Sequence, residues 1–285
     1  MTVRVPPRFT ERLIEALGEP ARRWSERLPA LAGRMLDRWS LRPDGEALHG
    51  FTALALPVRR ADGTPAMLKL MCPNEEGEHE ALALSIWNGQ GAVRLLAYDP
   101  HDWALLLERL DERRSLRDEP IDEAVTLLAG FLRRLDVPAP PAVRTLRSVA
   151  ARWERELAAH AHERVPSRFV DAAIAHCAEL GPRAGDRLVN EDLHYDNVLA
   201  GTREPWLVID PKPIAGDPEF ALISLLWNRF DGRPAERLTT VCRLAGLDAD
   251  LARRWTLVRA VETWADGPEF PTADRCAAIA ESVIE

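Results

Sequence analysis

Asp192, Asn197 and Asp210 are the residues of this sequence whose types and spacing best suit chemistry. Asp192 and Asn197 stand five positions apart. Phosphoryl-transfer enzymes use this spacing for an aspartate that accepts a substrate hydroxyl proton and an asparagine that binds Mg²⁺. Asp210 follows an apolar run, 206–209, and would supply a second metal-binding carboxylate. The pattern predicts a loop, a strand at Val198, a turn and a second strand ending at Asp210. Asp and Asn also populate ordinary turns, so the spacing alone would usually be structural.

Lysine is rare in this chain, which makes its lysines candidates for function. Of 37 basic residues only Lys69 and Lys212 are lysines. A compact ammonium that must touch a phosphate differs from a planar guanidinium, whereas a surface position seldom distinguishes the two. We predict that Lys69 contacts nucleotide phosphates and that Lys212 adds a second positive contact. The alternative is that codon bias disfavours lysine throughout the chain and that these two lysines remain by chance.

Glu80 is the predicted partner of Lys69. It follows the lysine by eleven residues, at the start of the apolar part of a helix expected over 76–87. Phosphoryl-transfer enzymes hold such a lysine with a helix carboxylate. Three other glutamates compete for this role: Glu75, Glu76 and Glu78. The alternative is an acidic helix start that favours the helix dipole.

The elements that must position these residues change character along the chain. Residues 9–39 show the apolar spacing of amphipathic helices broken near Gly18 and Pro20. Short strands are then predicted at 51–58, 66–71, 93–98 and 103–107. After Leu110 the pattern predicts helices over 121–135, 143–162, 167–180, 218–230, 234–244, 250–264 and 272–284.

This order predicts an α+β protein with two lobes. The N-terminal lobe, 1–110, would comprise a helical extension over 1–45 and a nucleotide-binding sheet with one helix. The helical C-terminal lobe, 111–285, would carry the catalytic loop and the substrate cleft. The backbone of Glu108 and Leu110 would lie at a hinge and meet the adenine, although a plain buried strand would look identical. Gly50 could mark a turn over the phosphates, but the sequence has no G-x-G-x-x-G.

Composition disfavours some classes of partner. A formal net charge of −8 argues against nucleic acid or an anionic membrane and suits a cationic partner. The cysteines are far apart and form no C-x-x-C pair, so we predict reduced, mostly buried thiols: Cys72, Cys177, Cys242 and Cys276. The first residues contain no apolar leader and no later run is long enough to span a bilayer. We expect a cytoplasmic monomer or weak dimer.

Several other residues are candidates for the acceptor site. Trp264, flanked by Glu262 and Asp266 at helical spacing, combines an aromatic ring with acids, as suits a cationic or polyhydroxyl sugar-like substrate. Core packing is the alternative for the tryptophan. His194, beside Asp192, leaves open a metal-dependent hydrolase, although the dense ligand set of such an enzyme is missing.

These motifs resemble the aminoglycoside phosphotransferase family, in particular its streptomycin 6-phosphotransferase and hydroxyurea phosphotransferase branch. The stretches that carry the resemblance are 87–96, 104–110, 192–199, 209–213 and 216–220. It implies a protein-kinase-like two-lobed fold and an ATP-dependent (or GTP-dependent) kinase acting on the hydroxyl of an antibiotic. It also implies that Asp192 is the base, that Asn197 and Asp210 bind Mg²⁺, and that Asp217 braces the catalytic segment.

The sequence departs from the family pattern just before the base. The usual His-Gly-Asp reads Asn190, Glu191 and Asp192. The first residue of that triplet supports the loop backbone in the family, and Glu191 is expected at the substrate entrance. This departure and the missing glycines keep one alternative open, a catalytically silent nucleotide-binding or regulatory protein of the same fold. A biosynthetic kinase for another small polar metabolite is a second alternative, because the sequence does not name the acceptor.

Overall fold

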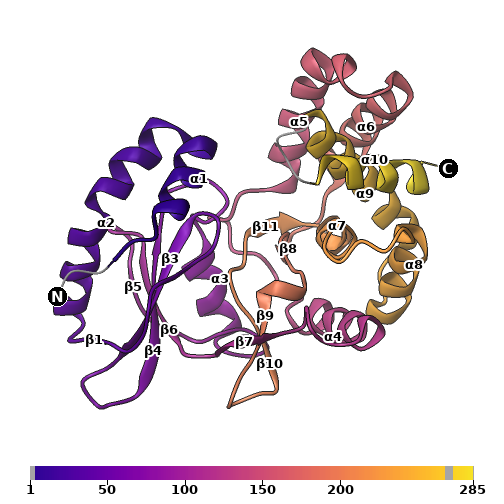
Figure 1. Ribbon diagram of the computed structural model, residues 1–285. Coiled ribbons are helices and arrows are strands. Elements are labelled where there is room, and N and C mark those ends of the chain that lie inside the picture. Colours follow the sequence, from indigo (N-terminus) through magenta and orange to yellow (C-terminus); the bar gives the residue numbers. More distant parts are fainter. Residues whose placement is uncertain (1–3, 267–271, 285) are drawn as a thin grey trace. The chain divides into compact units, whose positions relative to one another are not determined.

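The computed structural model describes residues 4–266 and 272–284. By their internal contacts these residues form two compact units. Unit 1 comprises 1–111 with 201–205, and unit 2 comprises 112–200 with 206–285, less the residues outside the described ranges. The chain therefore leaves unit 2 for five residues, 201–205, between two strands that belong to unit 2 (Figure 1).

The larger sheet of unit 1 is antiparallel, with the order β1-β3-β4-β6-β5 and with β2 pairing to β3. Its strands are β1 (Arg42–Pro43), β2 (Leu48–His49), β3 (Ala53–Arg59), β4 (Pro65–Met71), β5 (Leu95–Asp99) and β6 (Ala104–Glu108). A tight turn joins β3 to β4: Asp62 Oδ1 accepts the backbone N–H of Thr64 at 2.9 Å, and Gly63 takes a positive φ of 83°.

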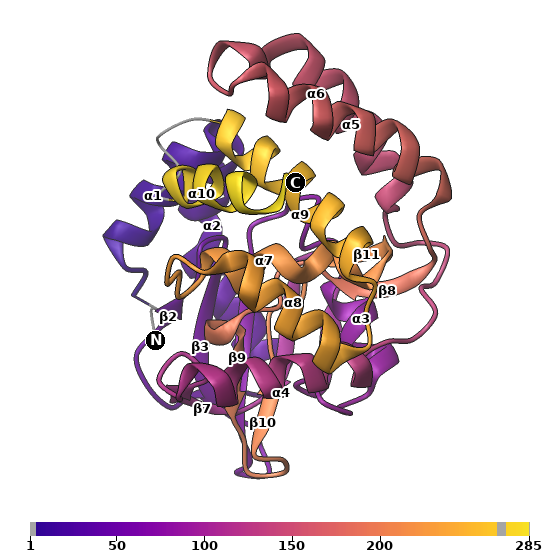
Figure 2. The ribbon, with the colours of Figure 1, turned by 90° about the vertical axis from the view of Figure 1, so that its right-hand side faces the viewer.

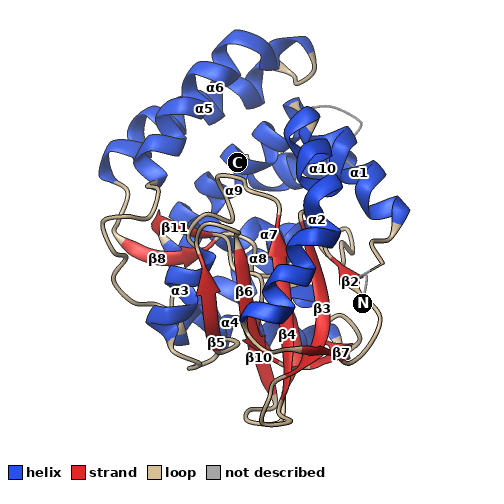
Figure 3. Cartoon of the chain, turned by 90° about the vertical axis from the view of Figure 1, so that its left-hand side faces the viewer, coloured by secondary structure: helices blue, strands red, loops and turns tan. Residues whose placement is uncertain are grey.

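Helices cover both faces of this sheet. On one face lie α1 (Pro7–Leu17) and α2 (Glu19–Arg38), separated at Gly18, whose φ of 65° suits glycine. Their apolar sides pack on alternate residues of β3 and β4 to form the core of unit 1 (Figure 3). The other face is covered by α3 (Glu80–Trp87). The predicted break near Gly18 is confirmed.

Unit 2 is mainly helical. Its helices are α4 (Ile121–Arg134), α5 (Leu146–His160), α6 (Ser167–Leu180), α7 (Ile223–Trp227), α8 (Pro234–Ala245), α9 (Ala249–Ala265) and α10 (Ala273–Val283). Side chains cap two of the starts: Thr145 accepts the N–H of Ser148, and Asp248 accepts the N–H groups of Asp250 and Leu251. Helices α5 and α6 pack side by side, and α9 packs against both α6 and α10 (Figure 2).

Two small sheets in unit 2 carry the segments that the sequence singled out. One has the order β10-β9-β7 and the other pairs β11 with β8. Their strands are β7 (Asp111–Ser115), β8 (Arg187–Asn190), β9 (Val198–Ala200), β10 (Trp206–Val208) and β11 (Pro213–Gly216). The predicted hairpin of β9 and β10 is confirmed, with Leu207 opposite Leu199. The sequence did not predict β7, β8 or β11.

The four cysteine thiols are free and buried, as predicted. Burial raises the pKa of Cys177 and of Cys276 to about 12 and that of Cys242 to about 11. These groups stay neutral and unreactive at ordinary pH. None of the helices formed by 4–266 and 272–284 combines the length and apolar character needed to cross a bilayer.

Candidate active site

Lys69 and Glu80 form a buried ion pair in unit 1. The Lys69 Nζ lies 2.7 Å from Oε1 and 2.6 Å from Oε2 of Glu80, and the residues are only 7% and 1% exposed. Lys69 stands on β4 between Ala55 of β3 and Leu105 of β6. Its neighbours along the strand belong to the core under α1 and α2. Because side chains alternate along a strand, Lys69 therefore points to the opposite face, where α3 supplies Glu80.

Glu108 ends β6 and is held by an arginine from the five-residue excursion. Arg203 donates to Glu108 from Nη2 at 2.7 Å and from Nε at 3.3 Å, and its Nη1 donates to the carbonyl of Gly89 at 2.5 Å. Glu108 Oε1 also accepts the N–H of Arg94 at 2.9 Å. The carboxylate of Glu108 is thus used within the protein, and its N–H donates to the carbonyl of Arg94 at 3.0 Å. The predicted contacts to a nucleotide base are then the carbonyl of Glu108 and the backbone of Leu110.

Asp192 lies in the loop between β8 and β9 of unit 2. Its Oδ2 is 2.9 Å from Nζ of Lys212, and its Oδ1 is 3.7 Å from Nε2 of His194. Asn197 donates from Nδ2 to the backbone carbonyl of Asp192 at 3.0 Å and to Oδ2 at 3.3 Å. The predicted base thus sits among a lysine, a histidine and an amide, with Lys212 as its direct ionic partner.

Asn190 ties the loop to the segment that carries Lys212. Its Oδ1 accepts the backbone N–H of Asp192 at 3.1 Å and that of Lys212 at 3.0 Å. The N–H of Glu191 donates to the carbonyl of Lys212 at 3.0 Å, which continues the ladder between β8 and β11. One amide oxygen therefore fixes the backbone of the predicted base relative to that of its lysine.

Asn197 and Asp210 offer oxygen ligands of the kind that Mg²⁺ prefers. The Nδ2 of Asn197 is used by Asp192, so its amide oxygen is directed elsewhere. The N–H of Ile209 donates to the carbonyl of Asn197 at 2.9 Å, which brings the residue before Asp210 beside Asn197. Asp210 itself has a φ of 50°, an unusual value for a non-glycine residue and one that is frequent at functional sites.

His194 stands between two carboxylates. Its Nδ1 is 3.5 Å from Asp196 Oδ2, and Asp196 Oδ1 is 2.8 Å from Nη1 of Arg117. The side chains of His194 and then Arg117 lower the pKa of Asp196 to about 2. Asp196 is consequently a fixed negative charge that holds the loop. Within the described ranges, no three His, Cys, Asp or Glu side chains are grouped so that they could hold a metal ion.

Glu191 is buried and its carboxylate pairs with Arg144. Its backbone carbonyl accepts hydrogen bonds from Ser224 Oγ at 2.8 Å and from Arg259 Nη1 at 3.0 Å. Arg259 also lies over the ring of Phe220, 4.8 Å from its centroid. In the present arrangement Glu191 anchors the loop to α7 and α9 from within unit 2.

The other predicted acceptor residues lie near the end of α9. The ring of Trp264 packs on Phe169 of α6 with centroids 5.6 Å apart, so this tryptophan contributes to helix packing. Arg164 Nη1 donates to the backbone carbonyl of Asp266 at 3.0 Å, while Thr263 Oγ1 donates to Glu262 at 3.2 Å. The carboxylate of Asp266, an exposed residue, lies close in sequence to 267–271, which are not described.

Asp217 braces the catalytic segment, in the way that the resemblance implied. Its Oδ2 accepts the indole N–H of Trp255 at 2.9 Å, and its Oδ1 accepts the N–H of Gly185 at 2.8 Å. Gly185 precedes β8 and Asp217 follows β11, and Gly216 pairs with Arg187. One carboxylate therefore closes the end of this strand pair that lies opposite Asn190. Trp255 in turn packs edge-on against Phe220.

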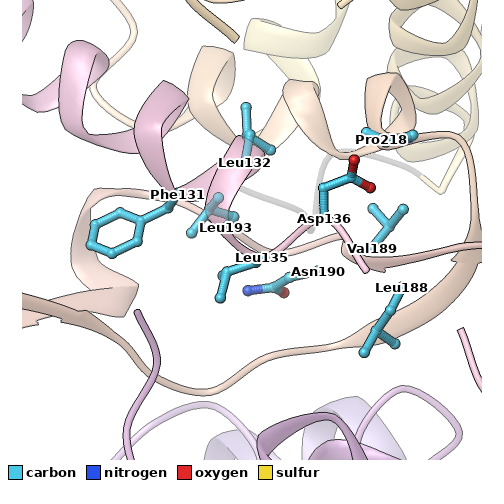
Figure 4. Close-up of a pocket in the computed structure, with 9 residues that line it drawn as sticks. All are labelled: Phe131, Leu132, Leu135, Asp136, Leu188, Val189, Asn190, Leu193 and Pro218. Atoms are coloured by element: carbon cyan, nitrogen blue, oxygen red, sulfur yellow. The ribbon is translucent and has the colours of Figure 1, made fainter. Parts of the chain in front are cut away.

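A small cavity lies behind the catalytic loop, lined mostly by apolar side chains of α4, β8 and the loop (Figure 4). Asn190 lines it, is only 6% exposed, and has no hydrogen-bond partner for its Nδ2 among the described residues. The Oδ1 is fixed by two N–H donors, which determines that the nitrogen occupies the other end of the amide. The cavity thus lies among the residues that hold the catalytic loop in place.

Comparison of the sequence with known proteins identifies its family. The sequence profile described as "Aminoglycoside/hydroxyurea antibiotic resistance kinase" matches residues 38–267. The chain belongs to this family. It is similar to a hydroxyurea phosphotransferase of Kitasatospora aureofaciens, with 43% identity over 99% of this chain and 86% of the relative. It is 41% identical to a streptomycin 6-kinase of Streptomyces glaucescens, over 91% of this chain and 89% of the relative.

The fold is similar to that of a solved phosphotransferase structure. A structure of a macrolide 2'-phosphotransferase from Brachybacterium faecium matches with a TM-score of 0.53 and 16% identity, covering 87% of this chain and 96% of that structure. The predicted protein-kinase-like α+β fold is confirmed. So is the predicted activity class, a kinase that transfers a phosphoryl group from a nucleotide to a small molecule.

Sequence reasoning missed three supporting residues: Asn190 as a shared acceptor, Arg144 and Arg203. Arg144 and Arg203 are two among many arginines, and nothing in their local sequence distinguishes them. Asn190 was visible only as a departure from the family triplet. Its double role depends on a partner at Lys212, which lies across β8 and β11 rather than nearby in sequence.

Proposed function

We propose that this kinase transfers the γ-phosphoryl group of MgATP to a hydroxyl of a cationic or polyhydroxyl antibiotic of the streptomycin type, and so confers resistance. The observation that carries the proposal is the environment of Asp192. Its carboxylate is 2.9 Å from Lys212 and accepts a hydrogen bond from Asn197, in a loop held by Asn190. A carboxylate so fixed can accept a hydroxyl proton from an acceptor.

Each residue has a proposed role. Asp192 orients the acceptor hydroxyl and takes its proton as the oxygen attacks phosphorus. Lys69, fixed by Glu80, contacts the nucleotide phosphates, and backbone groups of Glu108 and Leu110 contact the base. Lys212, already beside Asp192, neutralises charge on the transferred group.

Asn197 and Asp210 would hold Mg²⁺ through side-chain oxygens. The ion supplies charge neutralisation at the phosphates when it is bound. The chain's contribution is to present both oxygens from a single hairpin, because Asn197 precedes β9 and Asp210 follows β10. The backbone bond from Ile209 to Asn197 closes that hairpin at the site.

The proposed acceptor rests on charge and on relatives. The net charge of −8 favours a cationic acceptor over an anionic one. The relatives named above are a streptomycin 6-kinase and a hydroxyurea phosphotransferase, so both acceptors are candidates here. Glu262 and Asp266 near the end of α9 are proposed to meet the acceptor, with Trp264, packed on Phe169, as their support. Glu191 is buried against Arg144, so it is proposed to shape the entrance only through the position of the loop. MgATP and MgGTP are present in the cytoplasm, so the proposed location is the cytoplasm. The proposed oligomeric state is a monomer or weak dimer.

The test is phosphorylation of a panel of acceptors by the wild-type chain and by Asp192→Asn. We expect ATP-dependent mass gain on streptomycin or hydroxyurea with the wild type. The kcat of Asp192→Asn should be lower by about 10²- to 10⁴-fold, with MgATP binding retained. Turnover of an acceptor by Asp192→Asn at the wild-type rate would refute the role of the base. Binding of MgATP without turnover of any acceptor would support a catalytically silent protein instead.

A further inference from the structure

The turn between β2 and β3 has the properties of a phosphate-binding turn, although it is not rich in glycine. It comprises residues 50–52, at the end of β3 that pairs with Met71 of β4. The Gly50 N–H donates to the Ala53 carbonyl at 3.0 Å, and the Cys72 N–H donates to the Thr52 carbonyl at 2.8 Å. Among the described residues, neither Phe51 nor Thr52 donates its backbone N–H to another group. Two successive N–H groups without a partner inside the protein can be donated to an anion such as a phosphate, and no residue of 50–52 needs the positive φ of an αR-αL nest to present them.

This turn stands at a suitable distance from Lys69. The register of β3 and β4 places Lys69 opposite Ala55, and Thr52 precedes Ala55 by three residues. At about 3.3 Å per residue along a strand, the turn begins about 10 Å from the row that contains Lys69. That separation is comparable to the length of a triphosphate. Lys69 and the turn can therefore contact different phosphates of one nucleotide.

Helix α1 contacts the turn through one side chain and the residue just before the turn through another. The guanidinium carbon of Arg12 lies 5.8 Å from the centroid of the Phe51 ring, within the range of a cation–π interaction. The ring of His49, just before the turn, lies 5.2 Å from that of Phe9 at an angle of 33°. Phe9 belongs to the core of unit 1, so α1 is firmly anchored at this point.

Phe51 is an unusual residue for so exposed a position. It is 53% exposed, more than any other large hydrophobic side chain in the described part of the chain. A flexible glycine-rich loop positions its backbone by closing over the phosphates. Here α1 can contact the aromatic side chain at the tip and so order the turn before the nucleotide binds.

We propose that α1 is a positioning element for the nucleotide: Arg12, through Phe51, holds the β2–β3 turn so that its free N–H groups meet the phosphates. This inference rests on the proposed function, because it requires MgATP as a ligand. Arg12 and Phe51 are positioning residues, and neither takes part in phosphoryl transfer itself.

The experiment measures MgATP affinity by calorimetry for the wild type and for Arg12→Ala, Phe51→Ala and the double variant. Arg8→Ala is the matched control, since Arg8 is an exposed arginine of the same helix, while the cation–π contact to Phe51 is made by Arg12. We expect Arg12→Ala to weaken MgATP binding about two- to fivefold, the size of an exposed cation–π interaction. Arg8→Ala should bind as the wild type does.

The double variant decides the mechanism. If Arg12 acts through the ring, its removal in the Phe51→Ala background has no further effect on the MgATP affinity. A full additional loss in the double variant would overturn the proposal, because Arg12 would then contact the phosphates directly. The KM for the acceptor and the Tm should be unchanged in Arg12→Ala, which separates positioning of the nucleotide from loss of structure.

The outcomes also separate this inference from the proposed function. A wild-type chain that binds no MgATP would overturn both. A wild type that binds MgATP, with Arg12→Ala and Phe51→Ala equal to it in affinity, would overturn the role of α1 alone.

Discussion

At the scale of single residues, the contacts of Asn190 explain how the loop is held although this residue departs from the family pattern. Its side-chain oxygen accepts two backbone N–H groups, those of Asp192 and Lys212. A histidine is usual at this position in the resembling family, and asparagine can support the same loop by a different hydrogen-bond pattern. The pairing of Asp192 with Lys212 then follows from backbone positions that one atom fixes.

We predict that Asn190→Ala lowers the free energy of unfolding by about 2–4 kcal/mol, because two backbone donors lose their acceptor. Urea denaturation measures the loss. Asn190→Asp is the matched control, since it keeps an oxygen at the same place and should lose less stability. Equal losses in the two variants would show that the shared oxygen is not what holds the loop.

Lys212 is predicted to act on the chemical step rather than on nucleotide binding. Lys212→Met removes the ammonium beside Asp192 and keeps the length of the side chain, so kcat should fall about 10- to 100-fold with little change in the KM for ATP. Steady-state kinetics with a turned-over acceptor give both constants. A raised KM at unchanged kcat would instead assign Lys212 to ground-state binding of the nucleotide.

At the scale of elements, β11 packs closely against the start of α5. This contact positions the strand pair β8–β11, which supports the catalytic loop. A Cβ added at Gly216 would meet the Cβ of Leu146 at 2.6 Å, at the start of α5. The carbonyl of Arg144 accepts the N–H of Ala215 at 2.8 Å and continues this contact. Gly216 is therefore required by packing, because no side chain fits between strand and helix.

Gly216→Ala should destabilise unit 2 by about 1–3 kcal/mol, the cost of overpacking a filled interior. Gly130→Ala is the control within the same unit. It lies inside α4, has nothing within 4 Å of an added Cβ, and should stabilise the helix by about 0.5–1 kcal/mol. Thermal denaturation of both variants tests the pair, and a stabilising Gly216→Ala would contradict the packing argument.

At the scale of the whole molecule, stability depends on pH through buried carboxyl groups. Burial raises the pKa of Glu219, although a hydrogen bond from the Asp248 N–H opposes this. A raised folded-state pKa contributes stability that is present below the ordinary value of 4.5 and is lost as the pH rises through the raised value. Glu219 thus favours folding at acid pH and costs stability at neutral pH.

Glu219→Gln should consequently be more stable than the wild type at pH 8, and this advantage should shrink as the pH falls toward 4.5. Free energies of unfolding from urea titrations across this range give the comparison. An advantage that is constant with pH, or that grows toward acid pH, would show that the carboxyl pKa is not raised.

The sequence predicted elements well where a local pattern defined them. The helices of unit 2 and the hairpin of β9 and β10 have clear apolar periodicity and stop signals. It missed β7, whose residues 111–115 are all charged or polar, because that strand exists only through its pairing with β9. It also missed β11, which contains a proline and a glycine and is defined by its pairing with β8.

By itself the sequence determined the chemistry and the family: the spacing of Asp192 and Asn197, the carboxylate at Asp210, and Lys69 with Glu80 eleven residues later. These are short-range patterns, in which a strand, a turn or a helix fixes the direction of each side chain. Only the tertiary structure decided that Lys212 meets Asp192 and that Asn190 holds them both. Those contacts join residues about twenty positions apart across β8 and β11, and their hydrogen bonds depend on a strand register that local sequence does not encode.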